Sequence, residues 1–540
     1  MATTAQLTGT EPRERWSGQF GFIISAIGSA IGLGNIWRFP GVAYTNGGGA
    51  FLIPYLVALL TAGIPILLLD YSLGHRYQGS APTVFRRLKK RLEFAGWIQV
   101  LVCFVIVTYY AVILAWAIRY IIFSLNLAWK EDAGTFFLKD FLQISETPGF
   151  NLHVILGIFL PLLALWVAAA FVMSKGIAQG VEKLNRIFIP LLVVIFLALV
   201  IRALFLDGAM DGLNAFFTPN WQALTDPQVW IAAYAQIFYS LSVGFGIMLT
   251  YSSYLKRRSN ITPTGLVAGF ANSSFEILAG IGVFATLGFM AASQNVGINE
   301  LENITGPTLS FITFPTVIAM MPGGPIFGVI FFSSLVIAGF TSLVSLLQVI
   351  TSALKEKFGL SHKAASITIC ASAGTISILL FSTSNGLYAL DVVDKYINEI
   401  GIISCAIFTC IICAFYLKRL PILRAHLNYN SALQIGKWWE YVVAFLVPIV
   451  LGYMLIATII DLVKTPYGGY SGSFNLLFGW LVILLVLIVA LALQFAKWYR
   501  LVDIYDPMKY HGIESAGGYN DSPQNKQPAS GVSLIDAAKE

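Results

Sequence analysis

The sequence predicts an all-α integral membrane protein with about twelve transmembrane helices, arranged as two inverted five-helix repeats in which the first and sixth helices are broken. The first observation is composition: 57% of the 540 residues are hydrophobic and 11% are charged, against about 25% charged residues in soluble domains. The second is that the apolar residues form about twelve runs long enough to cross a bilayer. The third is that two of these runs are interrupted by glycines and polar groups.

The loops between the apolar runs indicate an orientation. Basic residues follow the second run at 86–91 and the sixth run at 256–258, and Lys and Arg mark the cytoplasmic loops of membrane proteins. We therefore expect a multi-pass protein of the cell membrane with both termini in the cytoplasm. The predicted spans are 20–41, 50–70, 97–126, 153–172, 187–206, 228–254, 265–291, 326–353, 365–382, 396–417, 439–461 and 474–498. The basic residues within spans or toward the outside are Arg38, Arg119, Lys130, Lys139, Arg202, Lys395 and Lys464.

These runs divide the chain into five parts. The parts are a cytoplasmic N-terminal segment with an inner gate (1–19), a first five-helix repeat (20–206), a second inverted repeat (207–417), two additional helices (418–511) and a disordered cytoplasmic tail (512–540). Two connections carry signals of their own. We expect a short amphipathic helix near 177–185, and an outer loop at 306–325 that folds back toward the membrane as a lid.

The first span contains residues that a plain membrane anchor would avoid. Gly28, Gly32 and Gly34 precede Asn35 and Arg38 within an apolar run. Each glycine weakens a helix by about 1 kcal/mol relative to alanine, and an arginine inside a membrane is costly. A helix that opens and turns its backbone groups toward a bound solute has this composition. The alternative is a close helix crossing through the small residues Gly28 and Gly32.

A second interrupted span favours the first of these interpretations. The sixth run reads QIFYSLSVGFG at 236–246, again with glycines and hydroxyls at membrane depth. Two broken helices in corresponding places of two five-span halves are typical of the central site of a secondary transporter. The positive end of a half-helix suits a carboxylate, and freed carbonyls suit a cation.

Polar residues in the neighbouring spans are candidates for the same site. Asn272 and Glu276 are four residues apart, so they share a helix face. A buried carboxylate needs a cation or a proton, although a structural hydrogen bond to a neighbouring helix is the alternative. Thr341 and Ser342 offer hydroxyl oxygens to an alkali cation, or bond the preceding turn of their own helix. Tyr110 belongs to a tyrosine pair that is equally compatible with packing.

Other classes of protein find little support. The five cysteines lie in apolar runs without metal-ligand spacing, and the five histidines are scattered. The net charge of +6 follows from the topology and requires no nucleic acid. A membrane enzyme lacks a nucleophile–base or metal cluster.

The most specific stretch is GSAIGLGNIWRFP at 28–40, followed by NGGGAFLIPY at 46–55. Together with the residues above, it resembles the neurotransmitter:sodium symporter family, and most closely its bacterial, leucine-transporter-like amino-acid transporters. The resemblance covers 13–394 closely and the remaining spans by their number. It implies two sodium ions per cycle. The first ion maps onto Ala30, Asn35, Ser240 and Asn272, and the second onto Gly28, Ile31, Ala338, Thr341 and Ser342.

The resemblance also implies a substrate pocket. Its positions in this chain are Ser29, Ala30, Gly32, Gly34, Ile106, Tyr110, Tyr239, Ser240, Ser242, Phe245, Ser342 and Leu346. Tyr110 is expected to meet the substrate carboxylate. Monoamine transporters of the family carry aspartate where Gly32 stands, so glycine implies a substrate with its own carboxylate. Burial against Ile106, Phe245 and Leu346 favours an apolar side chain, by about 0.8 kcal/mol per methylene.

Glu276 decides the expectation for chloride. Animal members bind chloride next to the first sodium ion and have serine at the matching position, whereas bacterial members with an acid there do not need the anion. We therefore expect chloride independence, with Tyr55, Gln236 and Ser240 around Glu276. Protonation of Glu276 on the return step is a hypothesis for proton antiport.

Two pairs of residues map onto the family's gates. On the outside Arg38 faces Asp394, with Tyr110 and Tyr239 as an aromatic lid. On the inside Arg13 faces Glu356, in place of the usual aspartate, and the neighbours of this pair are Trp16, Ser253 and Tyr254. Asp70 is a candidate to hold the amides freed by the break in the sixth span, or it lies at a solvated helix end.

The function expected from these residues is sodium-coupled import of neutral, hydrophobic amino acids by alternating access. The expected partners are the amino-acid substrate and membrane lipid, while the oligomeric state stays open. A non-transporting amino-acid sensor on the same fold is one alternative. A proton-coupled amino-acid transporter is another, although Thr341 and Ser342 argue against it.

Overall fold

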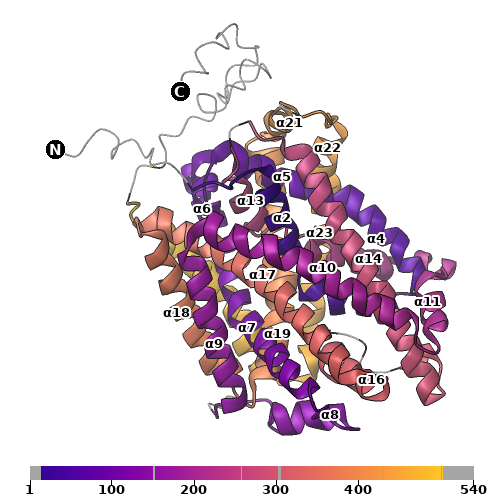
Figure 1. Cartoon of the computed structure of the whole chain (residues 1–540). Helices are drawn as coiled ribbons and strands as arrows, with labels where there is room; N and C mark the ends of the chain where they lie inside the picture. The colour runs from indigo at the N-terminus through magenta and orange to yellow at the C-terminus, as the bar shows by residue number, and fades with distance from the viewer. Residues whose placement is uncertain are drawn as a thin grey trace, which may run out of the picture.

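The computed structural model describes residues 14–149, 153–256, 258–301, 304, 306–429, 431–499 and 502. Within these residues, ten helical segments are long and apolar enough to cross a membrane, and a bent pair makes an eleventh. The bent pair consists of α2 (Gln19–Ala30) and the segment 34–45, at 51° to each other. The prediction of an all-α membrane protein is confirmed (Figure 1).

Most spans begin and end close to their predicted limits. The continuous spans are Gly49–Tyr77 (η2 to α5), Lys90–Ser124 (η4 and α7), Leu156–Ser174 (α9), Ile177–Leu204 (η6 and α10), Ile261–Gln294 (α14), Gly324–Phe358 (α17), His362–Phe381 (α18), Gly386–Tyr416 (α19 to η11), Trp438–Gly469 (α22 to η13) and Gly472–Phe495 (α24 to α25). The helix expected near 177–185 is not a separate element. It is η6 (Ile177–Glu182), which continues into α10 (Lys183–Leu204).

The sixth span, predicted at 228–254 as a broken helix, is two half-helices. They are α12 (Pro227–Ser240) and α13 (Ile247–Ser252), with six non-helical residues between them. Asp226 caps the first half by accepting a hydrogen bond from the Gln228 N–H at 2.9 Å. The second half is too short to count as a span by length, so its place in the fold depends on the packing around it.

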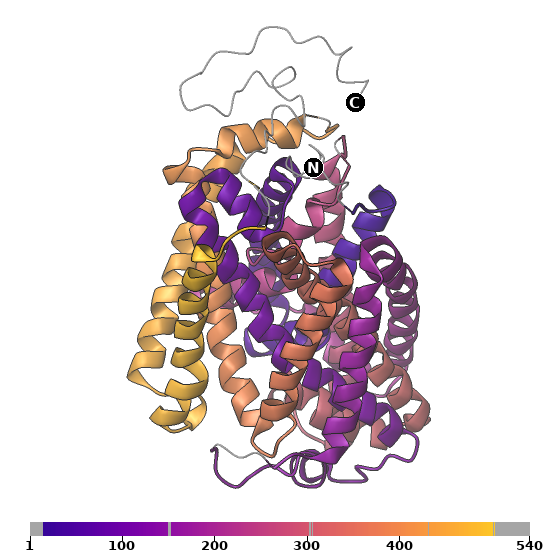
Figure 2. The same cartoon turned by 90° about the vertical axis from the view of Figure 1, so that its left-hand side faces the viewer.

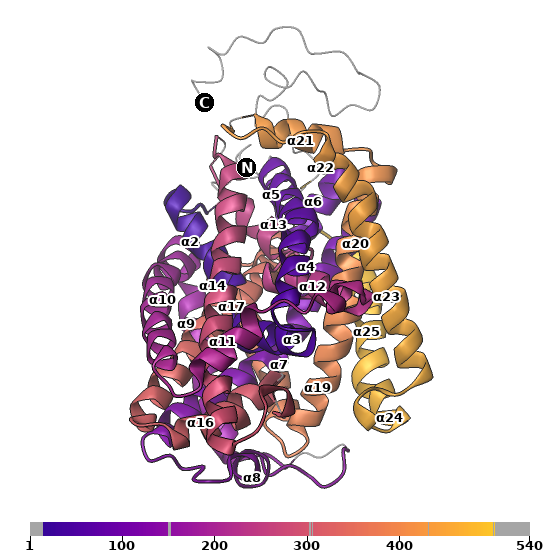
Figure 3. The same cartoon turned by 90° about the vertical axis from the view of Figure 1, so that its right-hand side faces the viewer.

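The spans form a bundle with a buried centre and a peripheral pair. Helices α7 (Glu93–Ser124) and α17 (Gly324–Phe358) pack along much of their length and are 72% buried, whereas the last two spans are 28% and 22% buried. Those two spans, with α23 (Val447–Lys464) and α25 (Leu481–Phe495), stand at one edge of the bundle (Figure 3). On another side α9 and α18 lie next to each other (Figure 2).

The bundle has two ends. We call one end the terminal face; it carries α21 (Leu420–Asn428), α6 (Ala81–Leu88) and the described start of the chain. We call the other end the opposite face; it carries α8 (Ala133–Thr135) and α16 (Phe314–Met320) (Figures 1 and 3). The loop expected to act as a lid contains α15 (Gly306–Thr308), η9 (Leu309–Thr313) and α16. Its Phe311 ring lies 6.3 Å from that of Trp37 in the first span.

Candidate functional site

The break in the first span exposes backbone polar groups in the middle of the bundle. Helix α2 ends at Ala30, and Ile31 is extended with ψ 105°. The chain resumes with a π-helical turn, η1 (Gly34–Arg38). The Asn35 Oδ1 accepts the freed N–H of Gly32 at 2.8 Å, and the Leu33 N–H donates to the Tyr110 hydroxyl at 3.3 Å. The glycine-rich hinge predicted here is confirmed.

The break in the sixth span depends on left-handed backbone. Ser242, Gly244 and Gly246 have φ values of +53°, +84° and +91°, a region that glycine adopts without steric cost. The Gly244 N–H donates to Asp70 Oδ2 at 2.9 Å. Asp70 is fully buried, so it holds an amide of the break and does not lie at a solvated helix end.

A hydrogen bond next to the two breaks joins the interrupted spans directly. The Ser242 hydroxyl donates to the Ser29 carbonyl at 3.1 Å. The Ser342 hydroxyl approaches the same carbonyl at 3.2 Å from α17. The two interrupted spans therefore meet at the centre of the bundle, where α17 completes the wall.

Three of the four residues assigned to the first sodium ion converge. The Asn35 Nδ2 donates to Asn272 Oδ1 at 2.9 Å and to Ser240 Oγ at 3.4 Å, and Asn272 also donates to Ser240. All three side chains are buried. Two carboxamide oxygens, a hydroxyl and the neighbouring carbonyls of the break form an oxygen-rich set with no net charge, which suits an alkali cation. Ala30, the fourth residue, ends α2 next to this cluster.

The residues assigned to the second sodium ion also lie together. The Ser342 hydroxyl is 3.3 Å from the Ile31 carbonyl, and the Thr341 hydroxyl donates to the Ala338 carbonyl at 2.9 Å. The bond from Thr341 to Ala338 lies within one helix, which is the alternative to ion binding that the sequence analysis left open. Gly28 fits closely against Asn185 of α10, because a Cβ on Gly28 would lie 2.0 Å from the Asn185 Oδ1. Among the described residues, no group of three or more His, Cys, Asp or Glu side chains could hold a metal ion.

The space around Gly32 is limited. A Cβ at this position would lie 2.8 Å from Ser342 Oγ and 3.2 Å from the Tyr110 hydroxyl. A Cβ on Gly34 would meet nothing within 4 Å. The apolar residues Ile106, Phe245 and Leu346 are buried in the same core. An aspartate at position 32 would therefore displace the hydroxyl of Ser342 or Tyr110.

Glu276 lies beside the first ion cluster and is fully buried. Its Oε2 accepts a hydrogen bond from Tyr55, and its Oε1 accepts one from Gln236 Nε2 at 2.7 Å. Ser240, the third expected neighbour, also lies within hydrogen-bond reach of this carboxyl group. It bonds Asn272 as well, which is one helical turn from Glu276 on α14. The carboxyl group thus lies next to the cluster of Asn35, Ser240 and Asn272.

The terminal face is closed around Trp16. Its indole N–H donates to the Tyr251 carbonyl at 2.8 Å, and its ring centroid lies 5.1 Å from that of Tyr251. The Tyr254 hydroxyl pairs with Ser352 at 2.5 Å. Ser253, another expected neighbour, is buried and donates to the carbonyl of Thr250 within its own turn.

Glu356, on the same face, accepts hydrogen bonds from the Ser80 N–H at 2.9 Å and hydroxyl at 2.7 Å, and from the Thr83 hydroxyl at 2.5 Å. These contacts attach α17 to α6. Its expected partner Arg13 lies outside the described residues, as does the tail at 512–540.

The opposite face contains a cavity of about 290 Å³ that reaches Arg38, Tyr239 and Gln236. The Arg38 guanidinium lies 3.6 Å from the centroid of the Tyr239 ring. Asp394 instead accepts a hydrogen bond from Asn398 at 2.7 Å, and among the described contacts no ion pair joins Asp394 to Arg38. The two expected gate residues lie on the same side of the site but are not paired.

Several residues of this region were missed by the sequence analysis. Asn398 holds Asp394, and their spacing of four residues on one helix was a usable signal. Two other residues could not be identified from the sequence, because their roles depend on contacts with distant helices. They are Asn185, which lies against Gly28, and Glu399, which lines the 290 Å³ cavity.

Comparison with known proteins defines the family. The profile of the sodium:neurotransmitter symporter family matches residues 13–136 and 130–501. The chain belongs to this family. An uncharacterised sodium-dependent transporter of Methanocaldococcus jannaschii is 40% identical over 486 residues, covering 90% of this chain and 98% of that protein. The human sodium- and chloride-dependent creatine transporter 1 is 31% identical over 449 residues, covering 73% of this chain and 69% of that protein.

A solved structure agrees with this assignment. The crystal structure of MhsT in complex with L-phenylalanine superposes with a TM-score of 0.70 at 31% identity, covering 83% of this chain and all of that one. This symporter is therefore a multi-pass membrane protein that couples sodium to transport of the amino-acid type. Its relatives are transporters, which confirms the expectation that it is not an enzyme.

Proposed function

We propose that this symporter imports neutral, hydrophobic amino acids together with two sodium ions and without chloride. The observation that carries the proposal is the convergence of Asn35, Ser240 and Asn272 from three different spans beside the open backbone of the first break. A substrate carboxylate would complete the oxygen shell of the first ion. Ion and amino acid then bind better together than apart.

The pocket supports a small zwitterion with an apolar side chain. The Tyr110 oxygen accepts the Leu33 N–H, and its O–H can donate to a substrate carboxylate at the same time. The side-chain end is walled by Ile106, Phe245 and Leu346, none of which can pair with a charge. L-Phenylalanine, which is bound in the MhsT structure, is an amino acid of this class.

Glu276 supports independence of chloride. Its buried carboxyl group can supply the negative charge that a chloride ion would bring to the first sodium site. The creatine transporters among the relatives are described as chloride-dependent, so this property divides the family. Proton antiport through the same carboxyl group is a hypothesis of the proposal.

We infer that the terminal face is cytoplasmic and that the two ends open alternately. The contacts of Trp16 with Tyr251 and of Glu356 with α6 would break when the terminal face opens. Arg38 would move from the Tyr239 ring toward Asp394 when the opposite face closes. The segments 20–206 and 207–417 would act as the two inverted repeats, and the peripheral helices of 418–511 would follow them.

The test is uptake into proteoliposomes containing the purified protein. Labelled leucine and phenylalanine are supplied with an inward sodium gradient, with gluconate replacing chloride. Accumulation that requires sodium and persists without chloride is the expected result. Uptake of creatine in place of both amino acids would refute the substrate class, and uptake driven by a proton gradient without sodium would refute the ion.

Binding without uptake would identify the sensor alternative. Thermal stabilisation by an amino acid in the presence of sodium, together with no accumulation in sealed vesicles, is the outcome that only a sensor would give.

A further inference from the structure

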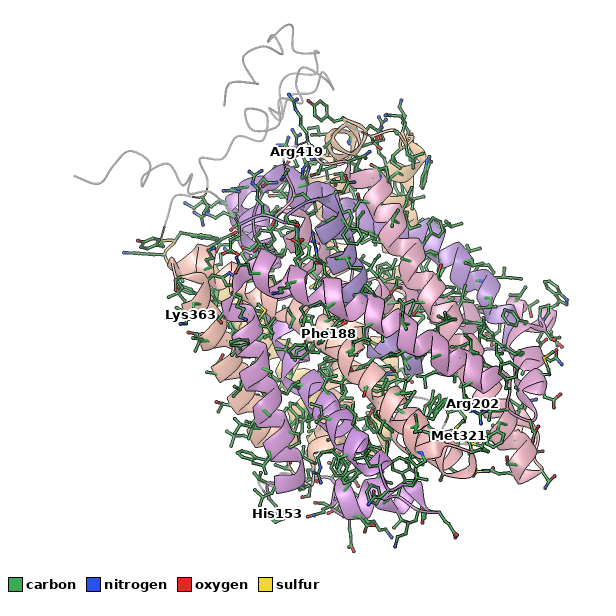
Figure 4. All side chains as sticks on the ribbon, viewed as in Figure 1. His153, Phe188, Arg202, Met321, Lys363 and Arg419 are labelled. Carbon is green, nitrogen blue, oxygen red and sulfur yellow. The ribbon has the colours of Figure 1, made fainter. Side chains whose placement is uncertain are left out.

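A second cavity lies at the opposite face, away from the central site. Its volume is about 500 Å³, and it lies between the end of α7, the turn η5 (Phe136–Phe141) and the start of α9. His153 marks this corner at the foot of α9 (Figure 4). Three phenylalanines form much of its wall: Phe123, Phe136 and Phe141. Their rings pack edge to face, with Phe123 at 5.1 and 5.4 Å from the other two.

Arg119 lines this cavity and brings a positive charge to it. It lies five residues before the end of α7, is half-buried, and its Nε is buried without a hydrogen-bond partner. Its guanidinium sits 4.7 Å from the centroid of the Phe123 ring. Within the described part of the chain it forms no ion pair. A guanidinium at membrane depth is expected to find an anion or to reach the headgroup region.

Asp140 brings an opposite charge to the same cavity. Its carboxylate is exposed, and among the described contacts it has neither a hydrogen bond nor an ion pair. Arg119 and Asp140 therefore line one space without pairing with each other. A ligand that carries one cationic group and one anionic group would satisfy both.

The position of the cavity favours a lipid over a dissolved molecule. Leu156 lines it and is 69% exposed, and Leu160, one turn further along α9, is 61% exposed. These side chains face outward from a span of which only 33% is buried, the surface expected to meet lipid. A Cβ on Gly157, which also lines the cavity, would meet nothing within 4 Å, so the approach from this side is open.

We propose that the 500 Å³ cavity holds the headgroup of a phospholipid in the adjoining leaflet, one that joins a phosphate to a primary ammonium group. Arg119 binds the phosphate through charge-assisted hydrogen bonds, which Arg makes in a fork geometry. Asp140 accepts hydrogen bonds from the ammonium group. The phenylalanine wall covers the glycerol and the first methylenes of the acyl chains.

The experiment measures which lipids stay with the protein. The full-length chain is reconstituted into nanodiscs that contain equal amounts of phosphatidylethanolamine, phosphatidylcholine and phosphatidylglycerol. After extraction into detergent, the retained lipids are quantified by mass spectrometry. The variants are Arg119→Gln and Asp140→Asn. Arg202→Gln is the matched control. Arg202 is also a half-buried arginine and lies near the end of α10 (Figure 4), but unlike Arg119 it does not line this cavity and donates to the Pro322 carbonyl at 3.3 Å.

The expected result is retention of phosphatidylethanolamine about tenfold above phosphatidylcholine, the difference that about 1.4 kcal/mol produces. Arg119→Gln should remove retention of all three phospholipids. Asp140→Asn should keep the phosphate contact and bring phosphatidylethanolamine down to the level of phosphatidylcholine. Arg202→Gln should behave as the parent protein.

Several results would overturn the proposal. They are equal retention of the three lipids by the parent protein, an unchanged profile in Arg119→Gln, and an unchanged preference in Asp140→Asn. The last variant alters an exposed side chain, so it decides the question even if Arg119→Gln does not fold. A free amino acid shares the same pair of charges. Labelled phenylalanine is therefore titrated onto delipidated protein. A second binding site that is lost in Arg119→Gln and kept in Arg202→Gln would assign the cavity to a soluble ligand and refute the lipid.

Discussion

The charge of Glu276 is the most direct test of how this symporter holds its first sodium ion. The perturbation is Glu276→Gln, which keeps the size of the side chain and one oxygen that can accept from Tyr55 or Gln236, while removing a negative charge. Because the residue is fully buried, water cannot replace the charge that is lost. Sodium affinity should fall more than fold stability.

The size of the effect follows from the geometry. Asn272, an expected ligand, is one turn away on α14, and side chains at that spacing lie about 5–6 Å apart. Two unit charges about 6 Å apart in a medium of effective dielectric constant about 20 attract by about 3 kcal/mol. That energy corresponds to a change of about a hundredfold in the sodium dissociation constant.

The assay is a sodium titration of labelled phenylalanine binding to the purified protein, with gluconate or chloride as the anion. Tyr55→Phe is the matched control, because it removes one donor and keeps the carboxylate, so its sodium affinity should change by at most about tenfold. Glu276→Ser makes room for an anion, and its binding should become dependent on chloride.

An unchanged sodium affinity in Glu276→Gln would refute the reasoning. It would mean that the carboxyl group carries a proton when sodium binds, and therefore that it contributes no charge. A chloride requirement in the parent protein would refute it independently.

Three further substitutions test the rest of the site. Asn35→Ala leaves the Gly32 N–H without its acceptor at 2.8 Å, and a buried N–H without an acceptor costs about 1–3 kcal/mol of free energy. The substitution should weaken sodium-dependent binding more than it lowers the thermal stability measured without sodium. Gly32→Ala places a Cβ 2.8 Å from Ser342 Oγ and should reduce phenylalanine affinity at least about tenfold in the same binding assay. Trp16→Ala removes the 2.8 Å hydrogen bond to Tyr251 and should open the terminal face. Faster proteolysis, or faster thiol labelling of a cysteine introduced at this face, would report the opening. Unchanged accessibility would contradict the prediction.

The parts of the fold that follow from local chemistry could be predicted from the sequence. Length and composition place the spans, and the glycines at 28–34 and 244–246 place the two breaks. The extent of the second break could not be predicted. It depends on Asp70 of another span, which binds the Gly244 N–H at 2.9 Å. The sequence left this contact open against a solvated helix end, because the burial of Asp70 depends on the packing of distant spans.

The site shows the same division. Asn35, Asn272 and Ser240 could be identified because their residue types and their family positions agree, and the structure brings them within hydrogen-bond distance. The relation of Arg38 to Asp394 could not, because it depends on how side chains of distant spans pack. Arg38 stacks on Tyr239, and Asp394 accepts a hydrogen bond from Asn398.

The central contacts also connect the proposed sodium sites to the proposed substrate pocket. The Ser342 hydroxyl touches the carbonyls of Ser29 and Ile31 on one side, and on the other it limits the space beside Gly32 where substrate is proposed to bind. Asn35 reaches the same segment by accepting the Gly32 N–H. An ion that draws these oxygens together therefore changes the shape of the substrate pocket. Linkage requires the converse effect to be equal, so the factor by which saturating sodium raises phenylalanine affinity must equal the factor by which saturating phenylalanine raises sodium affinity. A common factor of about one, with each ligand binding as well alone as with the other, would mean that the two sites are not coupled, and the shared segment at 29–35 would lose its proposed role.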